Sequence, residues 1–210
     1  MKIFVDFDNT IFDTKHKFLD RFFDVFYYYS VSREDFDNTL PHFSKTSLQT
    51  GECYSPKKHI KKIKKITERN IDEKVFLQEM SEFLEDLEKY VFEDFYQFVN
   101  GFDKKDLIIL SYGDYEFQKQ KINGSGVVQF FEDVIITQGD KTKEIEKYMQ
   151  DFPNEKIVLV DDKLGYFENA KKSKLNIQTI HVVRGSDKCV QTVCDMHITT
   201  LDKIKKSTIR

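Results

Sequence analysis

The chain alternates between short continuous apolar runs and stretches in which apolar residues recur every three or four positions. Continuous runs bounded by polar turns are typical of buried strands, and the three-to-four spacing is typical of helices with one buried face. The runs predict strands over residues 2–5, 106–110, 134–137, 156–160, 177–183 and 197–199. Helical patterns separate the later runs, from about residue 115, over 143–149 and over 166–172. This alternation predicts an α/β fold, a Rossmann-like, mostly parallel sheet with helices on both faces.

Residues 14–100 carry helical patterns alone. An apolar stripe begins at Phe18, and Ser55-Pro56 starts a helix in which Ile60, Ile63 and Ile66 form the expected buried stripe. A further helix from about Asp72 is expected to bury Val75, Phe76, Met80, Phe83, Leu84 and Leu87. We therefore predict an α/β core made of residues 1–13 and 101–210, with an all-helical domain of residues 14–100 inserted between its two pieces.

Composition excludes several classes of protein. A hydrophobic content of 40% with 33% charged residues is ordinary for a soluble globular chain, and a net charge of −3 argues against a general nucleic-acid binder. No apolar run is long enough for a membrane span. The first strand begins almost at the first residue, which leaves no room for a signal peptide, so a cytoplasmic location is expected.

Cysteine and histidine usage does not indicate a metal site. Cys53, Cys189 and Cys194 lack C-x-x-C spacing, and we interpret them as reduced structural thiols. The five histidines are scattered and none is spaced from another as metal ligands are, so a zinc site is not expected.

Candidate chemistry lies where the predicted strands end. Asp6 and Asp8 follow the first strand, Ser111 the second and Asp161-Asp162 the fourth, while a lysine near residue 141 follows the third. In a parallel sheet these ends share one edge, so the side chains converge in one crevice. A D-x-D-x-T turn is also compatible with a solvated turn that bonds its own backbone. The complete set instead favours phosphoryl chemistry, in which an Asp attacks phosphorus, Mg²⁺ binds carboxylates, and Lys and Ser hold phosphoryl oxygens.

Four segments resemble the motifs of the haloacid dehalogenase superfamily of phosphohydrolases. Asp6-Phe7-Asp8-Asn9-Thr10 is similar to the first motif of that family, and residues 107–111, ending in Ser111, are similar to the second. Gly139-Asp140-Lys141 resembles the third motif and residues 158–162 the fourth. The four occur in the family's order and span the whole α/β part. The helical domain lies where the family inserts a small helical cap.

The resemblance implies a role for each matching residue. Asp6 would be the nucleophile and a metal ligand, and Asp8 would protonate the leaving alcohol, activate water and give the metal its backbone carbonyl. Asp162 would be a further ligand with Asp161 supporting it. The phosphoryl group would be bound by Thr10, Ser111, Tyr112 and Lys141. The family's third-motif lysine aligns with either Lys141 or Lys143. Dehalogenases of the family lack a second acid at the position of Asp8, which favours phosphate chemistry.

The function that this implies is a Mg²⁺-dependent phosphomonoesterase that works through an aspartyl-phosphate on a small phosphorylated metabolite or nucleotide. One alternative is a phosphoglucomutase-like phosphotransferase. Another is a non-catalytic or nucleic-acid-end-processing module of the same fold, for which the lysine-rich stretch 57–65 is the one supporting feature. A helix with that many lysines is more often a solvated face, so nucleic acid is not the expected partner.

Overall fold

The computed structural model describes residues 1–40, 53–185 and 193–209. Its strands are β1 (Lys2–Val5), β2 (Leu107–Tyr112), β3 (Asp133–Thr137), β4 (Ile157–Asp161), β5 (Gln178–Val182) and β6 (Met196–Ile198). Its helices are α1 (Leu19–Tyr28), α2 (Arg33–Thr39), α4 (Pro56–Thr67), α5 (Glu73–Phe83), α6 (Asp94–Val99), α7 (Tyr115–Gly124), α8 (Lys141–Asp151) and α9 (Leu164–Lys172). Cys189, one of the three cysteines interpreted as structural thiols, lies outside the described residues.

The described strands form one parallel sheet in the order β3-β2-β1-β4-β5-β6. The chain runs outward from β1 in one direction through β2 and β3, then returns to the other side of β1 with β4. The strand order therefore reverses between β1 and β4, and the loops after these two strands diverge to leave a crevice at their carboxyl ends. This confirms the predicted Rossmann-like α/β fold.

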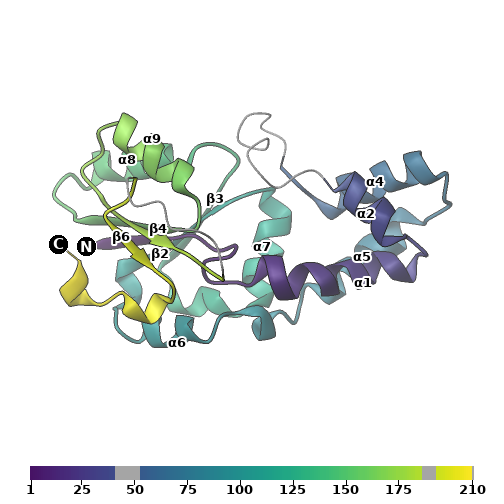
Figure 1. Ribbon diagram of the computed structural model, residues 1–210, viewed down its shortest axis with the longest axis horizontal. Helices are drawn as coiled ribbons and strands as arrows, with labels where there is room; N and C mark the ends of the chain where they lie inside the picture. Colours follow the sequence, from purple (N-terminus) through teal and green to yellow (C-terminus); the bar gives the residue numbers. More distant parts are fainter. Residues whose placement is uncertain (41–52, 186–192, 210) are drawn as a thin grey trace.

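Alternate residues of the central strands face opposite sides of the sheet, and each side is covered by helices. On one side Phe4 and Leu159 pack with Ile145 of α8 and Phe167 of α9. On the other side lie Ile3, Val5, Val158 and Val160, together with side chains of α6 and α7. Figure 1 shows α8 and α9 above the sheet and α6 below it. The central strands have continuous apolar sequences because both of their faces are buried.

The helices between β1 and β2 largely begin where the sequence indicated. Ser55 caps α4 by accepting a hydrogen bond from the Lys58 backbone N–H, and Asp72 caps α5 in the same way. Helices α1, α2, α4 and α5 extend away from the sheet (Figure 1), whereas α6 packs against the C-terminal turn Leu201–Lys203. Buried aromatic residues of these helices and one face of the sheet belong to one continuous apolar cluster. The division of the chain at residues 13 and 100 stays a prediction.

Two residues expected inside the helical domain are exposed. Ile66 is 58% exposed and Val75 is 46% exposed. Three-residue steps advance about 300° around a helix, so by the third member of the Ile60 series the side chain has turned about 120° away from the first. In α5 the buried line runs through Phe76 and Met80, and Val75 lies about 100° from Phe76 around the helix.

Helix α7 stands between the sheet and the outer helices (Figure 1). Its Phe117 ring packs against Phe22 of α1, with ring centroids 5.8 Å apart. Its last residue, Gly124, accepts a 2.9 Å hydrogen bond from the Leu87 backbone N–H. A Cβ atom at residue 124 would lie 1.8 Å from the Leu84 carbonyl oxygen, so this close approach of two backbones requires glycine.

Candidate active site

Asp6 lies at the carboxyl end of β1, beside the crevice. Its backbone N–H donates to the Val160 carbonyl at 2.8 Å, so the strand pairing with β4 continues up to this residue. The chain then folds back, since the backbone N–H groups of Ile11 and Phe12 both donate to the Phe7 carbonyl at 3.0 Å. Asn9 has φ of 58°, a conformation that asparagine tolerates better than most residues. The turn holds Asp6 and Asp8 in fixed directions.

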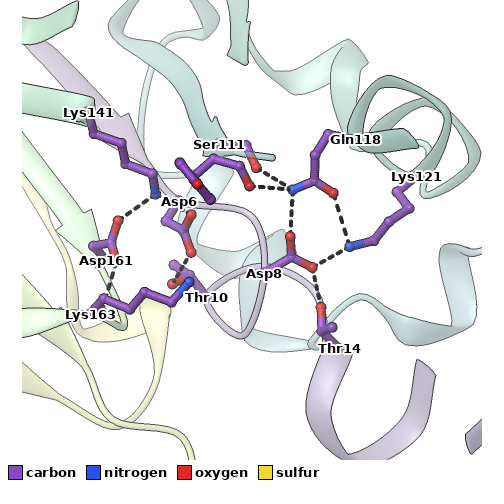
Figure 2. A network of polar contacts seen from close by, with 11 residues as sticks. Asp6, Asp8, Thr10, Thr14, Ser111, Gln118, Lys121, Lys141, Asp161 and Lys163 are labelled. Atoms are coloured by element: carbon purple, nitrogen blue, oxygen red, sulfur yellow. Dashed lines mark hydrogen bonds and ion pairs between the residues drawn. The ribbon is translucent and has the colours of Figure 1, made fainter. Parts of the chain in front are cut away.

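The first group of charged side chains, called here the Asp6 cluster, consists of Asp6, Lys141, Asp161 and Asp162. Lys141, the first residue of α8, places its Nζ against Asp6 Oδ1 and 2.6 Å from Asp161 Oδ2 (Figure 2). Thr10 donates through Oγ1 to Asp6 Oδ2 at 3.2 Å. Lys141 is 1% exposed and Asp161 is fully buried, so these charges have little water to solvate them.

Burial and mutual repulsion raise the pKa of Asp6 and of Asp162. Desolvation raises the pKa of Asp6 to about 6, with Lys141 opposing this effect and Asp161 adding to it. Desolvation also raises the pKa of Asp162 well above its ordinary value, and the neighbouring charges of Asp6 and Asp161 raise it further. Burial alone would lower the pKa of Lys141, but Asp161 and Asp6 outweigh it and raise that pKa. Three carboxylates therefore face two cations, Lys141 and the nearby Lys163, so the cluster can hold more negative charge than these cations compensate.

The residues present fit a divalent cation. Asp6, Asp161 and Asp162 bring one carboxylate oxygen each within 4.8 Å of one another. Asp162 Oδ1 is buried and has no hydrogen-bond partner within the described part of the chain, which is costly for an acceptor unless another group binds it. An all-oxygen donor set at a site with excess negative charge suits Mg²⁺.

The second group, the Asp8 cluster, consists of Asp8, Thr14, Gln118 and Lys121. Lys121 Nζ and Thr14 Oγ1 both contact Asp8 Oδ1, and Gln118 Nε2 donates to Asp8 Oδ2 at 2.6 Å. Burial would raise the pKa of Asp8, but the adjacent Lys121 and these hydrogen bonds lower it to about 2. In this geometry Asp8 is a fully compensated carboxylate.

Helix α7 links the Asp8 cluster to the end of β2. Gln118 Nε2 lies 2.8 Å from Ser111 Oγ and 3.2 Å from the Tyr112 carbonyl oxygen, so one amide joins Asp8 to the second strand (Figure 2). Gly113 makes room for it, because a Cβ there would lie 2.6 Å from Gln118 Cγ. Lys121 is 2% exposed and its Nζ lies 5.3–5.5 Å from the ring centres of Phe7, Phe12, Phe18 and Phe117.

The structure brings most of the sequence-predicted residues to one edge of the sheet. Lys141 rather than Lys143 contacts Asp6, and Lys143 is exposed. Of the two adjacent carboxylates, Asp161 is paired with Lys141. Asp162 Oδ1 is buried and accepts no hydrogen bond within the described residues. Tyr112 contributes its carbonyl to the site, and its ring packs with the apolar cluster that covers the α8 and α9 face of the sheet. The assignment of catalytic and ligand roles to these residues stays a prediction.

Sequence reasoning missed Thr14, Gln118 and Lys121. Polar residues on a helix are ordinarily expected to face solvent, yet Gln118 and Lys121 are buried. One signal was present. Gln118 is four residues before the apolar Ile122, and Lys121 is four residues after Phe117, so both share a helix face with an apolar residue on a helix that follows a candidate strand end.

The histidines are scattered along the sequence, but the fold brings two of them together. Residues 181 and 197 are far apart along the chain, but β5 and β6 are neighbours and their register pairs His181 with His197. The two Nδ1 atoms lie 3.1 Å apart.

Within the described ranges no helix combines the length and apolar character that crossing a membrane requires.

No protein-family model matches the chain, and no curated protein sequence matches it. Solved structures do resemble it. A haloacid dehalogenase-like hydrolase from Burkholderia xenovorans LB400 is 21% identical, with a TM-score of 0.72 over 96% of this chain and 93% of that one. The HAD-hydrolase YfnB from Bacillus subtilis, solved bound to magnesium, is 16% identical, with a TM-score of 0.62 over 96% and 95%.

A third structure of the same kind is L-2-haloacid dehalogenase from Xanthobacter autotrophicus, solved with chloropropionic acid covalently bound. It is 12% identical to this chain, with a TM-score of 0.60 over 96% of this chain and 95% of that one. At these identities the likeness concerns the fold, and it extends over nearly the full length of each pair. Together with the strand order and its switch point, it shows that this chain has the fold of the haloacid dehalogenase-like hydrolases.

Proposed function

We propose that the chain is a Mg²⁺-dependent phosphomonoesterase that forms an aspartyl-phosphate on Asp6 and acts on a small phosphorylated metabolite or nucleotide. The observation that carries the proposal is the Asp6 cluster, where three carboxylates meet Lys141 and the nearby Lys163, and Asp162 Oδ1 lacks a partner among the described residues. Such an excess of negative charge favours a bound cation, and a phosphate dianion needs that cation to approach Asp6.

Asp6 is suited to nucleophilic attack. Thr10 Oγ1 and Lys141 Nζ hold its two oxygens in different directions, so the carboxylate cannot rotate freely. In the proposed reaction an Asp6 oxygen bonds to phosphorus as the bond from phosphorus to the alcohol oxygen breaks, and water later attacks the same phosphorus to free Asp6. Bound Mg²⁺ would be held by Asp6 and Asp162 and would neutralise phosphoryl charge.

Lys141 and Ser111 would bind the phosphoryl oxygens. Lys141 Nζ is within contact of Asp6, and Ser111 Oγ lies at the end of the neighbouring strand. A cation and a hydroxyl fixed beside the nucleophile stabilise the charge that spreads over the phosphoryl group in the transition state.

Asp8 is proposed to move the protons. It would give a proton to the leaving alcohol oxygen in the first step and take one from the attacking water in the second. The lowered pKa of Asp8 favours the carboxylate form, which suits the second step. The first step needs the protonated form, so the contact between Asp8 and Lys121 has to loosen when substrate binds. An acid at this position favours phosphate esters over carbon-halogen bonds, because a halide leaves without a proton.

A phosphatase screen tests the proposal. Metabolite and nucleotide monophosphates are incubated with wild-type protein and Mg²⁺, and phosphate release is compared with that in EDTA. We expect Mg²⁺-dependent hydrolysis that Asp6→Asn lowers by at least about 10³-fold. Asp151→Asn, an exposed acid at the end of α8, is the matched control and should keep wild-type rates.

Three outcomes would contradict the proposal. Equal rates in Mg²⁺ and EDTA would exclude the metal, and an Asp6→Asn variant as active as wild type would exclude the nucleophile. Phosphate transfer to a sugar acceptor in place of release would assign the phosphotransferase function instead.

A further inference from the structure

A second group of metal-binding atoms lies at the edge of the sheet, in side chains that the proposed hydrolysis does not use. The His181 cluster consists of His181 on β5, His197 on β6 and Cys194 just before β6. Each contributes one nitrogen or sulfur atom, and these atoms lie within 4.8 Å of one another. The register of two parallel strands sets His181 beside His197, so the grouping follows from the backbone.

The hydrogen bonds of His181 fix which of its nitrogens points into the cluster. Nε2 lies 3.0 Å from the Asp162 carbonyl oxygen. A carbonyl oxygen can only accept, so Nε2 carries the hydrogen and, in the neutral ring, Nδ1 carries the lone pair. That lone pair is directed at His197 Nδ1, 3.1 Å away. A metal-binding histidine ordinarily donates its other N–H to a carbonyl or carboxylate in this way.

The distances from His197 to the other two side chains are close to those between ligands of one tetrahedral ion, and all three ligand atoms lie within 4.8 Å of one another. Zn²⁺ with bonds of about 2.0–2.1 Å to nitrogen and about 2.3 Å to sulfur keeps two nitrogens about 3.3 Å apart, and a nitrogen and a sulfur about 3.5 Å apart. Here the two Nδ1 atoms are 3.1 Å apart, and Cys194 Sγ is 3.5 Å from His197 Nδ1 and 3.1 Å from Nε2 of the same ring. Two imidazoles and a thiol form a softer donor set than the all-oxygen Asp6 cluster and suit zinc better than magnesium.

We propose that His181, Cys194 and His197 bind a Zn²⁺ ion through His181 Nδ1, His197 Nδ1 and Cys194 Sγ. Binding converts the Cys194 thiol to a thiolate and releases its proton to solvent, while both histidines bind as neutral rings. Cys194 and His197 are partly exposed, which gives the ion a path to the site. The site is a separate one from the Asp6 cluster, but the hydrogen bond from His181 to the Asp162 carbonyl connects them.

Zinc binding to the metal-free full-length chain tests the proposal. The probe is Zn²⁺ alone, titrated against a chromophoric chelator of known affinity, with bound metal also counted by mass spectrometry. We expect one tightly bound Zn²⁺ in wild type. Cys194→Ser and His197→Asn should each weaken this binding by at least about 100-fold, the upper end of what loss of a supporting contact costs.

Two matched variants separate this site from its neighbours. Cys53→Ser removes a described cysteine outside the cluster, and Asp162→Asn removes a carboxylate of the Asp6 cluster while keeping the backbone carbonyl that His181 contacts. Both should bind Zn²⁺ within about threefold of wild type, well below the cost of a lost ligand. Loss of binding in Asp162→Asn with retention in Cys194→Ser would assign the ion to the carboxylates and overturn the proposal, as would absence of tight binding in wild type.

Wild-type protein provides a further readout if a variant fails to fold. Co²⁺ in place of Zn²⁺ gives a sulfur-to-cobalt charge-transfer absorption only when a thiolate binds it, and metal ligation protects a cysteine from alkylation. We expect that absorption together with slower alkylation of Cys194, mapped by peptide mass spectrometry, when metal is added. If Cys194 is alkylated at the same rate with and without metal, His181 and His197 form only a hydrogen-bonded pair and the proposed site does not exist.

Discussion

The Asp6 cluster and the Asp8 cluster both bury carboxylates beside a lysine, but they differ in how many positive charges and hydrogen-bond donors face those carboxylates. In both, a lysine that is almost fully buried contacts a carboxylate at the end of β1. In the Asp8 cluster one lysine and two neutral donors face one carboxylate. In the Asp6 cluster Lys141 contacts Asp6 and Asp161, and the carboxylate of Asp162 lies beside them. Lys163 lies close enough that Asp162 and Asp6 raise its pKa against the effect of burial.

The difference shows that neighbouring charges and hydrogen bonds decide whether burial leaves the pKa of each carboxyl group raised or lowered. Desolvation acts on both Asp6 and Asp8 and raises the pKa of each. For Asp8, Lys121 and the hydrogen bonds outweigh desolvation and the pKa falls to about 2. For Asp6, desolvation together with the charge of Asp161 outweighs Lys141 and the pKa rises to about 6. In the Asp8 cluster the carboxylate charge is compensated by its neighbours, whereas in the Asp6 cluster a bound cation would compensate the remaining negative charge.

Replacement of the buried lysine in each cluster should have the largest effect on the free energy of unfolding and should distinguish the two clusters most clearly. Lys121→Met and Lys141→Met each leave buried carboxylates without their cation, and each should lower the free energy of unfolding by about 3–5 kcal/mol in EDTA. Mg²⁺ should recover much of the loss in Lys141→Met, because the cation replaces part of the missing charge. It should recover none in Lys121→Met. Urea unfolding with and without Mg²⁺ measures both.

Lys143→Met is the control for these two variants. Lys143 is exposed on the same helix as Lys141, and its replacement should stay within about 0.5 kcal/mol of wild type. If Mg²⁺ restored both buried-lysine variants equally, the contrast between a complete and an incomplete cluster would be wrong.

The pH dependence of stability should differ in sign between the clusters. The pKa of Asp6 is about 6 in the folded state and 3.8 when unperturbed, so between these values the folded state binds more protons than the unfolded state. Asp6 therefore contributes more stability as pH falls from 6 to 4, by up to about 3 kcal/mol. The contribution of Asp8, with its pKa lowered to about 2, is constant there and is lost only as pH falls below 3.8.

Unfolding in EDTA at pH 4–7 measures this difference. The free energy of unfolding of wild type minus that of Asp6→Asn should rise as pH falls through the window, and the same difference for Asp8→Asn should stay flat. A rise for Asp8→Asn, or a fall for Asp6→Asn, would reverse the assignment of the two clusters.

Thermal stabilisation by Mg²⁺ is the smallest expected effect. At about ten times its Kd, an ion that binds only the folded state adds about 1.4 kcal/mol, or a Tm rise of roughly 4 °C. Asp162→Asn should abolish the rise and Asp8→Asn should keep it, since an Asn at residue 8 retains the backbone carbonyl. A Tm that Mg²⁺ raises equally in both variants would place the ion elsewhere.

The sequence predicted the sheet and the convergence of Asp6, Ser111 and Asp161 because both follow from local patterns. Continuous apolar runs mark strands buried on two faces, and the carboxyl ends of parallel strands necessarily share an edge. The choice between Lys141 and Lys143 was also within reach. Asp140 caps α8 by accepting from the Thr142 backbone N–H at 3.0 Å, which makes Lys141 the first helical residue and turns it toward the crevice.

The other site residues could not be identified from the sequence, because their positions depend on contacts between segments that are far apart along the chain. Gln118 and Lys121 are polar residues on a helix, and only the position of α7 between sheet and outer helices makes their burial possible. His181 and His197 come together through the register of two strands joined by a long connection. In each case tertiary placement decided what the side chain touches.

The contact at Gly124 limits how the outer helices can be placed relative to α7. Two backbones touch there with no side chain between them, and the Leu87–Gly124 hydrogen bond joins the outer helices to α7. Straight separation of the helices from the sheet would break this bond, whereas rotation about it would keep it. Any residue larger than glycine at position 124 would collide with the Leu84 carbonyl and push the end of α7 and the outer helices apart at this point.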